Sequence, residues 1–127
     1  MNFNQATLPA RDLQASVSFY EALGLILVVR TEDYARFELP DGEATLSLSR
    51  VEATEVNSAS GIHIYFECED LDARYAALTA KGMAFESAPE DKRWLWREAW
   101  MRDPSGNSIC LYWAGKNRKN PPWRIEG

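Results

Sequence analysis

The sequence predicts an α+β fold in which two tandem βαβββ modules form curved mixed sheets around a shared cleft. Two observations favour this fold. Stretches with the two-residue period of strands flank stretches with helical spacing. A shift of 58 positions, from residue 5 to residue 63, also lays the first such unit on a second one. The matching pairs are Gln5 with His63, Asp12 with Asp70, Leu13 with Leu71, Ala15 with Ala73, and Gly24 with Gly82.

The first module is predicted over residues 1–50. Residues 3–10 alternate in polarity, which is typical of a strand. Asp12 is expected to cap a helix that ends at Gly24, because glycine adopts the left-handed conformation easily. Three further strands are expected, separated by turns of acidic, proline and glycine residues. They cover residues 25–30, 34–39 and 44–49.

The second module is predicted over residues 61–114 and repeats this order. A strand from His63 is followed by a helix from Asp70 to Gly82. The remaining strands are expected at residues 83–86, 94–101 and 107–113. Residues 51–60 lack periodicity and are interpreted as a linker. Residues 115–127 contain Pro121-Pro122 and are predicted to form an extended tail, either free or lying across a neighbouring subunit.

Composition restricts the class of protein. With 127 residues, 46% of them hydrophobic, the chain suits one domain with one core. A net charge of -5 disfavours nucleic acid and anionic membranes as partners. No stretch approaches the roughly 18 apolar residues of a membrane span, and the N-terminus does not resemble a signal peptide. We therefore expect a cytoplasmic protein in which Cys68 and Cys110 stay reduced and buried.

Three segments carry a resemblance to a known family. Residues 8–13 (LPARDL), residues 63–67 (HIYFE) and residues 103–107 (DPSGN) resemble the module starts and the last turn of the glyoxalase/bleomycin-resistance/dioxygenase superfamily, also called vicinal oxygen chelate proteins. The resemblance extends to about Ala114. It implies a single domain of this type over residues 1–127, and it leaves the activity open.

The resemblance also implies four metal-ligand positions, one on the first and one on the last strand of each module. Here they read Gln5, Ser47, His63 and Cys110. Both carboxylates of the catalytic relatives are replaced, and one histidine cannot supply a 2-His-1-carboxylate iron site. We expect no metal, no cofactor and no catalytic residue. The alternative is a zinc ion held by Gln5, His63 and the Cys110 thiolate.

Polar residues with a two-residue period are predicted to line the cleft. In the second module they are His63, Tyr65 and Glu67, with His63 interpreted as a hydrogen-bonding residue. In the first module, Gln5, Arg36 and Ser47 lie in corresponding rows. Arg36 suits an anionic ligand, although an internal ion pair with Glu38 or with another carboxylate explains it at least as well.

A tryptophan-rich strand is the most unusual feature. Trp94, Trp96, Glu98 and Trp100 fall on one face by the two-residue period. Core packing or a subunit interface explains such a face as well as a stacking platform for a planar or cationic ligand does. The sequence does not decide which face looks into the cleft.

The favoured function is that of a small-molecule binder without a catalytic metal. The family's bleomycin-resistance members resemble this chain in size, acidity and lack of metal ligands, and they sequester a cationic aromatic antibiotic. The runner-up is a metal-dependent lyase, isomerase or dioxygenase, and the third hypothesis is a structural or regulatory dimer. A homodimer is expected in each case. The candidate ligand-binding residues are Gln5, Arg36, Ser47, His63, Tyr65, Glu67, Trp94, Trp96, Glu98, Trp100 and Cys110.

Overall fold

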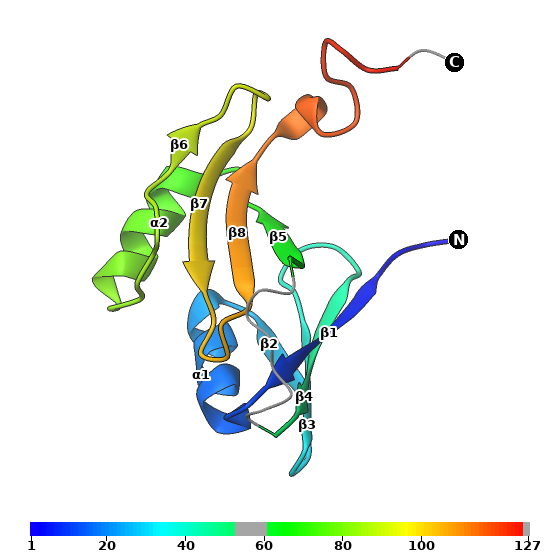
Figure 1. Cartoon of the computed structure of the whole chain (residues 1–127), viewed down its shortest axis with the longest axis vertical. Coiled ribbons are helices and arrows are strands. Elements are labelled where there is room, and N and C mark those ends of the chain that lie inside the picture. Colours follow the sequence, from blue (N-terminus) through cyan, green and yellow to red (C-terminus); the bar gives the residue numbers. More distant parts are fainter. Residues whose placement is uncertain (53–60, 126–127) are drawn as a thin grey trace. The chain divides into compact units, whose positions relative to one another are not determined.

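The computed structural model describes residues 1–52 and 61–125, so most of the linker predicted at residues 51–60 lies outside the described residues. The chain divides into two units (Figure 1). Unit 1 comprises residues 1–61 and 103–107, and unit 2 comprises residues 62–102 and 108–127. Each contains one helix longer than a single turn and one four-stranded sheet. The two predicted βαβββ modules are thus confirmed.

Unit 1 contains the first module. Its elements are β1 (Gln5–Ala10), α1 (Leu13–Leu23), β2 (Ile26–Arg30), β3 (Tyr34–Glu38) and β4 (Thr45–Arg50). The strand order is β1-β4-β3-β2, in which β1 runs parallel to β4 and the other neighbours are antiparallel. All four predicted strands are present, with ends that differ by at most two residues from the expected ones.

Helix α1 begins and ends as its sequence predicts. The Asp12 carboxylate accepts a hydrogen bond from the backbone N–H of Ala15 at 3.0 Å, which satisfies one free donor of the first turn. Gly24 ends the helix with a φ of 115°, a conformation that favours glycine. Between these ends, Val17 and Tyr20 are buried, and α1 packs against β2, β3 and β4.

The loop between β7 and β8, residues 103–107, completes unit 1. Tyr20 donates a hydrogen bond to Asp103 Oδ2 at 2.6 Å, in a buried position. The other oxygen, Oδ1, accepts the backbone N–H groups of Ser105 and Asn107, each at 2.9 Å. Ser105 in turn accepts from the backbone of Arg11 at 2.9 Å. The loop predicted as the final turn of the second module therefore supplies hydrogen-bond acceptors to residues of the first module.

Unit 2 contains the second module. Its elements are β5 (His63–Glu67), α2 (Leu71–Ala80), β6 (Glu90–Asp91), β7 (Arg97–Arg102) and β8 (Ser108–Trp113), followed by the 3-10 helix η2 (Gly115–Asn117). The strand order is β5-β8-β7-β6, with β5 parallel to β8. This order matches unit 1 strand for strand. Within the described residues, no helix is long and apolar enough to cross a membrane.

Unit 2 departs from the sequence prediction in two strands. The prediction of a strand at residues 83–86 is wrong, because the strand that pairs with β7 is the short β6 at Glu90–Asp91. The strand expected from Trp94 begins only at Arg97. Residues 92–96 form a turn instead, in which Leu95 has a φ of 69° and Lys92 donates its N–H to the Trp96 carbonyl. The alternating tryptophans predict a strand here because a two-residue pattern in the sequence does not distinguish a strand from a turn of this kind.

The ends of two other segments also differ. Asp70 precedes α2 as expected but makes no capping hydrogen bond. Its carboxylate instead lies 3.7 Å from the Arg74 guanidinium. The tail expected to be extended from residue 115 begins with η2. The reason is local, since Glu67 accepts the backbone N–H groups of Ala114 and Gly115, which fixes the chain where η2 starts.

Candidate functional site

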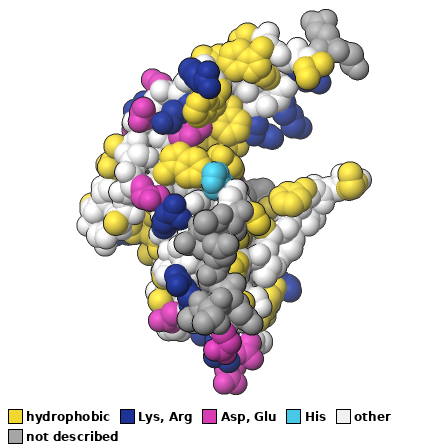
Figure 2. All heavy atoms as spheres, in the orientation of Figure 1, with side chains coloured by type: hydrophobic (Ala, Val, Ile, Leu, Met, Phe, Trp, Pro, Cys, Tyr) yellow, Lys and Arg dark blue, Asp and Glu magenta, His cyan; other side chains and the backbone are white. Residues whose placement is uncertain are grey.

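Aromatic side chains gather on one face of the unit 2 sheet. The aromatic cluster consists of His63, Tyr65, Trp96, Trp100 and Tyr112. Tyr65 is central, with ring centroids 5.6–5.9 Å from Tyr112, Trp100 and Trp96. Trp96 stacks on Tyr112 at 4.6 Å, and the His63 ring meets Trp100 edge-on at 4.9 Å. Figure 2 shows this apolar surface in yellow beside the cyan of the protein's single histidine.

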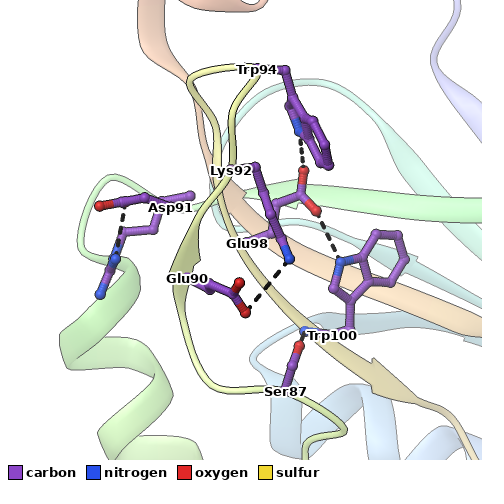
Figure 3. A network of polar contacts seen from close by, with 8 residues as sticks. Ser87, Glu90, Asp91, Lys92, Trp94, Glu98 and Trp100 are labelled. Atoms are coloured by element: carbon purple, nitrogen blue, oxygen red, sulfur yellow. Dashed lines mark hydrogen bonds and ion pairs between the residues drawn. The ribbon is translucent and has the colours of Figure 1, made fainter.

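A buried carboxylate lies at the edge of this cluster. Glu98 projects from β7 and is 4% exposed. Its two oxygens accept hydrogen bonds from two indole N–H groups, Trp94 Nε1 at 2.7 Å and Trp100 Nε1 at 3.0 Å (Figure 3). Burying a carboxylate is costly unless donors satisfy it, and the two indoles supply these donors. The arrangement fixes both tryptophan rings around one negative charge.

Basic side chains lie next to the cluster. The Arg93 guanidinium lies 5.9 Å from the centre of the Trp94 ring, a cation–π distance. Lys92 pairs with Glu90 at 3.6 Å (Figure 3). The turn before β7 therefore holds the Arg93 guanidinium over the Trp94 ring.

Three predicted site residues have structural partners within unit 2. The Glu67 carboxylate binds the backbone at the start of η2. Trp96 Nε1 donates to the carbonyl of Asn117 at 3.4 Å. Cys110 is fully buried, and burial raises the pKa of its thiol to about 12. Glu67, Trp96 Nε1 and Cys110 are thus engaged within unit 2, whereas the Tyr65 ring stays 44% exposed.

In unit 1, four side chains form a polar relay: Gln5, Ser47, Tyr34 and Arg36. Gln5 Nε2 donates to Ser47 Oγ at 2.8 Å, and Ser47 Oγ lies 2.6 Å from Tyr34 Oη. Arg36 Nε donates to the same phenol oxygen at 2.9 Å. The hydrogen bond with Ser47, followed by the effects of Arg36, lowers the pKa of Tyr34.

The structure brings Gln5, Arg36 and Ser47 together with Tyr34 in one set of hydrogen bonds. Tyr34 lies two residues before Arg36, so the two-residue period places both on one face. Within residues 1–52 and 61–125, no ion pair joins Arg36 to Glu38 or to another carboxylate, so the ion-pair alternative is not adopted there.

Comparison with models of known protein families shows to which family the chain belongs. The family model for the Glyoxalase/Bleomycin resistance protein/Dioxygenase superfamily matches residues 2–111. The chain belongs to this superfamily.

Among curated proteins, this superfamily member is 33% identical to the uncharacterized protein YraH of Bacillus subtilis (strain 168), over 88% of this chain and 98% of YraH. Among solved structures, a bleomycin-binding protein complexed with bleomycin is similar, with a TM-score of 0.73 and 24% identity over 89% of this chain and 98% of that one. Lactoylglutathione lyase from Agrobacterium tumefaciens gives a TM-score of 0.70 and 22% identity over 87% and 92%. An antibiotic binder and an enzyme therefore share this fold, and only the side chains can distinguish the two functions.

The superfamily's metal-dependent members raise the question whether this chain's residues fit a metal. Ser47 is fully buried and bonded to Gln5 and Tyr34, and Cys110 is a neutral thiol near neutral pH. No carboxylate stands at these positions, and hard divalent cations prefer carboxylate oxygens as ligands. In the described part of the chain, no group of three His, Cys, Asp or Glu residues is placed to hold a metal. The residues at the ligand positions do not fit a divalent metal.

Proposed function

We propose that the protein binds a planar or cationic small molecule on the aromatic cluster of unit 2 without transforming it. The observation that carries the proposal is the Glu98 carboxylate, which is buried among aromatic rings and held by two indole N–H groups. A cation over an aromatic face is attracted by the ring, and a nearby carboxylate adds to that attraction. The antibiotic-binding member with the same fold is consistent with this use.

Exposure of the rings supports ligand access. Tyr65 is 44% exposed and Trp94 is 40% exposed, which is high for large aromatic residues. Arg93 over Trp94 is an internal example of a cation that suits this surface. A flat cationic ligand has the same charge as Arg93 and a larger face for stacking.

The enzymatic alternative is a metal-dependent lyase, isomerase or dioxygenase. The side chains at the ligand positions argue against it because they lack the carboxylates that bind the metal and move protons. Elemental analysis of native protein should find less than one divalent metal per chain. A stoichiometric zinc or nickel ion that is lost in His63→Ala would revive this alternative.

The binding test is a titration with aromatic cations, bleomycin among them, followed by tryptophan fluorescence. Glu98→Gln should weaken binding by about 1 to 2 kcal/mol, while an uncharged ligand of the same shape should lose much less. Trp123→Phe is the matched control, because Trp123 is 57% exposed and lies outside the cluster. Equal losses for charged and uncharged ligands, or turnover of a 2-oxoaldehyde thiol adduct, would contradict the proposal.

The protein is further proposed to be a homodimer. Exposed aromatic residues such as Trp94 and Trp123 offer apolar surface of the kind that interfaces use. Light scattering should then give about twice the chain mass of 14.4 kDa. A monomer at micromolar concentration would exclude this assembly and leave the ligand proposal intact.

A further inference from the structure

The polar relay of unit 1 has a defined direction that starts at Gln5. A side-chain amide has one acceptor oxygen and two N–H donors. Thr45 donates to Gln5 Oε1, and Gln5 Nε2 donates to both Thr7 Oγ1 at 3.2 Å and Ser47 Oγ at 2.8 Å. Both N–H groups are therefore used, and Ser47 is the acceptor in its contact with Gln5.

The next hydrogen bond joins Ser47 to Tyr34, and its donor follows from the burial of Ser47. Its side chain is fully buried, and its oxygen lies 2.6 Å from Tyr34 Oη. If Tyr34 were the donor, the hydroxyl proton of Ser47 would be buried without an acceptor, a situation that folded proteins avoid. Ser47 therefore donates to Tyr34.

The phenol of Tyr34 is left with a free proton. Its oxygen accepts from Ser47 and from Arg36 Nε, which occupies both of its acceptor positions. In the described parts of the chain, nothing accepts the phenol proton or the Nη protons of Arg36. The Arg36 guanidinium lies 5.4 Å from the centre of the Tyr34 ring, so both groups of donors are close together.

We propose that Tyr34 and Arg36 form a binding site for an oxyanion, carried by an organic carboxylate or a phosphate. A planar guanidinium binds two oxygens of such a group in parallel, and the phenol adds a third donor. The site goes beyond the proposed function. It lies in unit 1 and takes a negative group, whereas the aromatic cluster of unit 2 takes a positive one.

The charges around the site predict how it can be tuned. Glu38 lies two residues after Arg36 on the same face and is exposed, so it repels an incoming anion. Removing this charge by Glu38→Gln should strengthen anion binding. Arg30→Leu is the matched control, because Arg30 contacts Thr31 and Gln14 and takes no part in the relay.

The experiment is a pair of NMR titrations, one with acetate and one with inorganic phosphate, at constant ionic strength. Saturable shifts are expected at Arg36 Nε–Hε and at the Tyr34 amide. Tyr34→Phe should weaken binding by about tenfold, since one hydrogen bond to a charged group is lost. Arg36→Leu should abolish it, Arg30→Leu should leave it unchanged, and Glu38→Gln should tighten it. The probe that binds more tightly identifies the carboxylate or phosphate class.

Two results would overturn the oxyanion site. One is the lack of saturable shifts with either probe, and the other is an equal loss of binding in Arg36→Leu and Arg30→Leu. The indole N–H signals of Trp94 and Trp100 should stay unchanged with both probes and should move with aromatic cations. The failure of one site is therefore distinguishable from the failure of the other.

Discussion

Units 1 and 2 have the same strand order but place different chemistry on matching sheet positions. In each unit, one row of three paired residues crosses the first, last and third strands of the module. The row consists of Thr7, Ser47 and Arg36 in unit 1, and of Tyr65, Cys110 and Trp100 in unit 2. Hydrogen-bonding groups in one unit are thus matched by a thiol and aromatic rings in the other.

This difference teaches that the scaffold sets positions while the side chains set ligand preference. Unit 1 presents the exposed cation of Arg36 and the free phenol of Tyr34. Unit 2 presents aromatic faces around the carboxylate of Glu98. The two proposals therefore assign ligands of opposite charge to the two faces.

The largest expected effect comes from disrupting the loop at residues 103–107, whose contacts in unit 1 have no counterpart in unit 2 within the described residues. Asp103→Ala removes the buried partner of Tyr20 and the acceptor of two backbone N–H groups. The free energy of unfolding should fall by about 3 kcal/mol, because several buried donors lose their acceptor. Urea denaturation measures this loss. Asp33→Ala, which removes only an exposed ion pair with Arg50, is the control and should have a much smaller effect.

The next effect concerns pH at the matching positions Ser47 and Cys110. Burial raises the pKa of the Cys110 thiol from 9.0 to about 12, so the unfolded chain loses this proton at lower pH than the folded one. The stability that Cys110 contributes is complete below pH 9 and is lost as pH rises toward 12. Unfolding measured between these values should therefore show a shallower decline in Cys110→Ala than in the native protein. The same slope in both proteins would contradict the raised pKa. Ser47 does not ionise in this range and adds no such slope.

A smaller effect is expected when the relay of unit 1 is interrupted. Ser47→Ala removes the hydroxyl that joins Gln5 to Tyr34 and should cost about 1 kcal/mol of stability. Ser49→Ala, two residues along the same strand and less buried, serves as the control. Thermal unfolding compares the two variants. Equal stability of both would show that the relay adds nothing to folding.

The smallest effect sharpens the proposal for unit 2. Arg93→Ala removes the guanidinium over the Trp94 ring and frees that ring for a ligand. Affinity for an aromatic cation should rise by about 0.5 kcal/mol, the lower range of an exposed cation–π contact. Isothermal titration calorimetry measures the change. Weaker binding in this variant would mean that Arg93 itself helps to hold the ligand.

The sequence predicted the elements whose signals are local. Asp12 and Gly24 define α1 because a cap and a left-handed residue act within one helical turn. The two-residue pattern does not reveal the turn at residues 92–96, because tryptophans alternate through it. The hydrogen bond from Trp94 to Glu98 depends on that turn. The two-residue pattern therefore groups these residues on one face but does not show that they are hydrogen-bonded. The two-residue period puts Tyr34 on the same face as Arg36, but its hydrogen bond with Ser47 depends on strand register, which a single sequence does not give.

The loop at residues 103–107 has a consequence for the order of synthesis. In unit 1, the acceptor for Tyr20 follows 83 residues later in the chain, and the hydroxyl that binds the Arg11 backbone follows 94 residues later. Domains generally fold as they leave the ribosome, at about 5–20 residues per second. The first module therefore waits several seconds for its last contacts, with the buried Tyr20 hydroxyl lacking its partner. We therefore expect that the first module does not fold independently of the loop, so a chain ending at residue 61 should fail to reach the native form of unit 1.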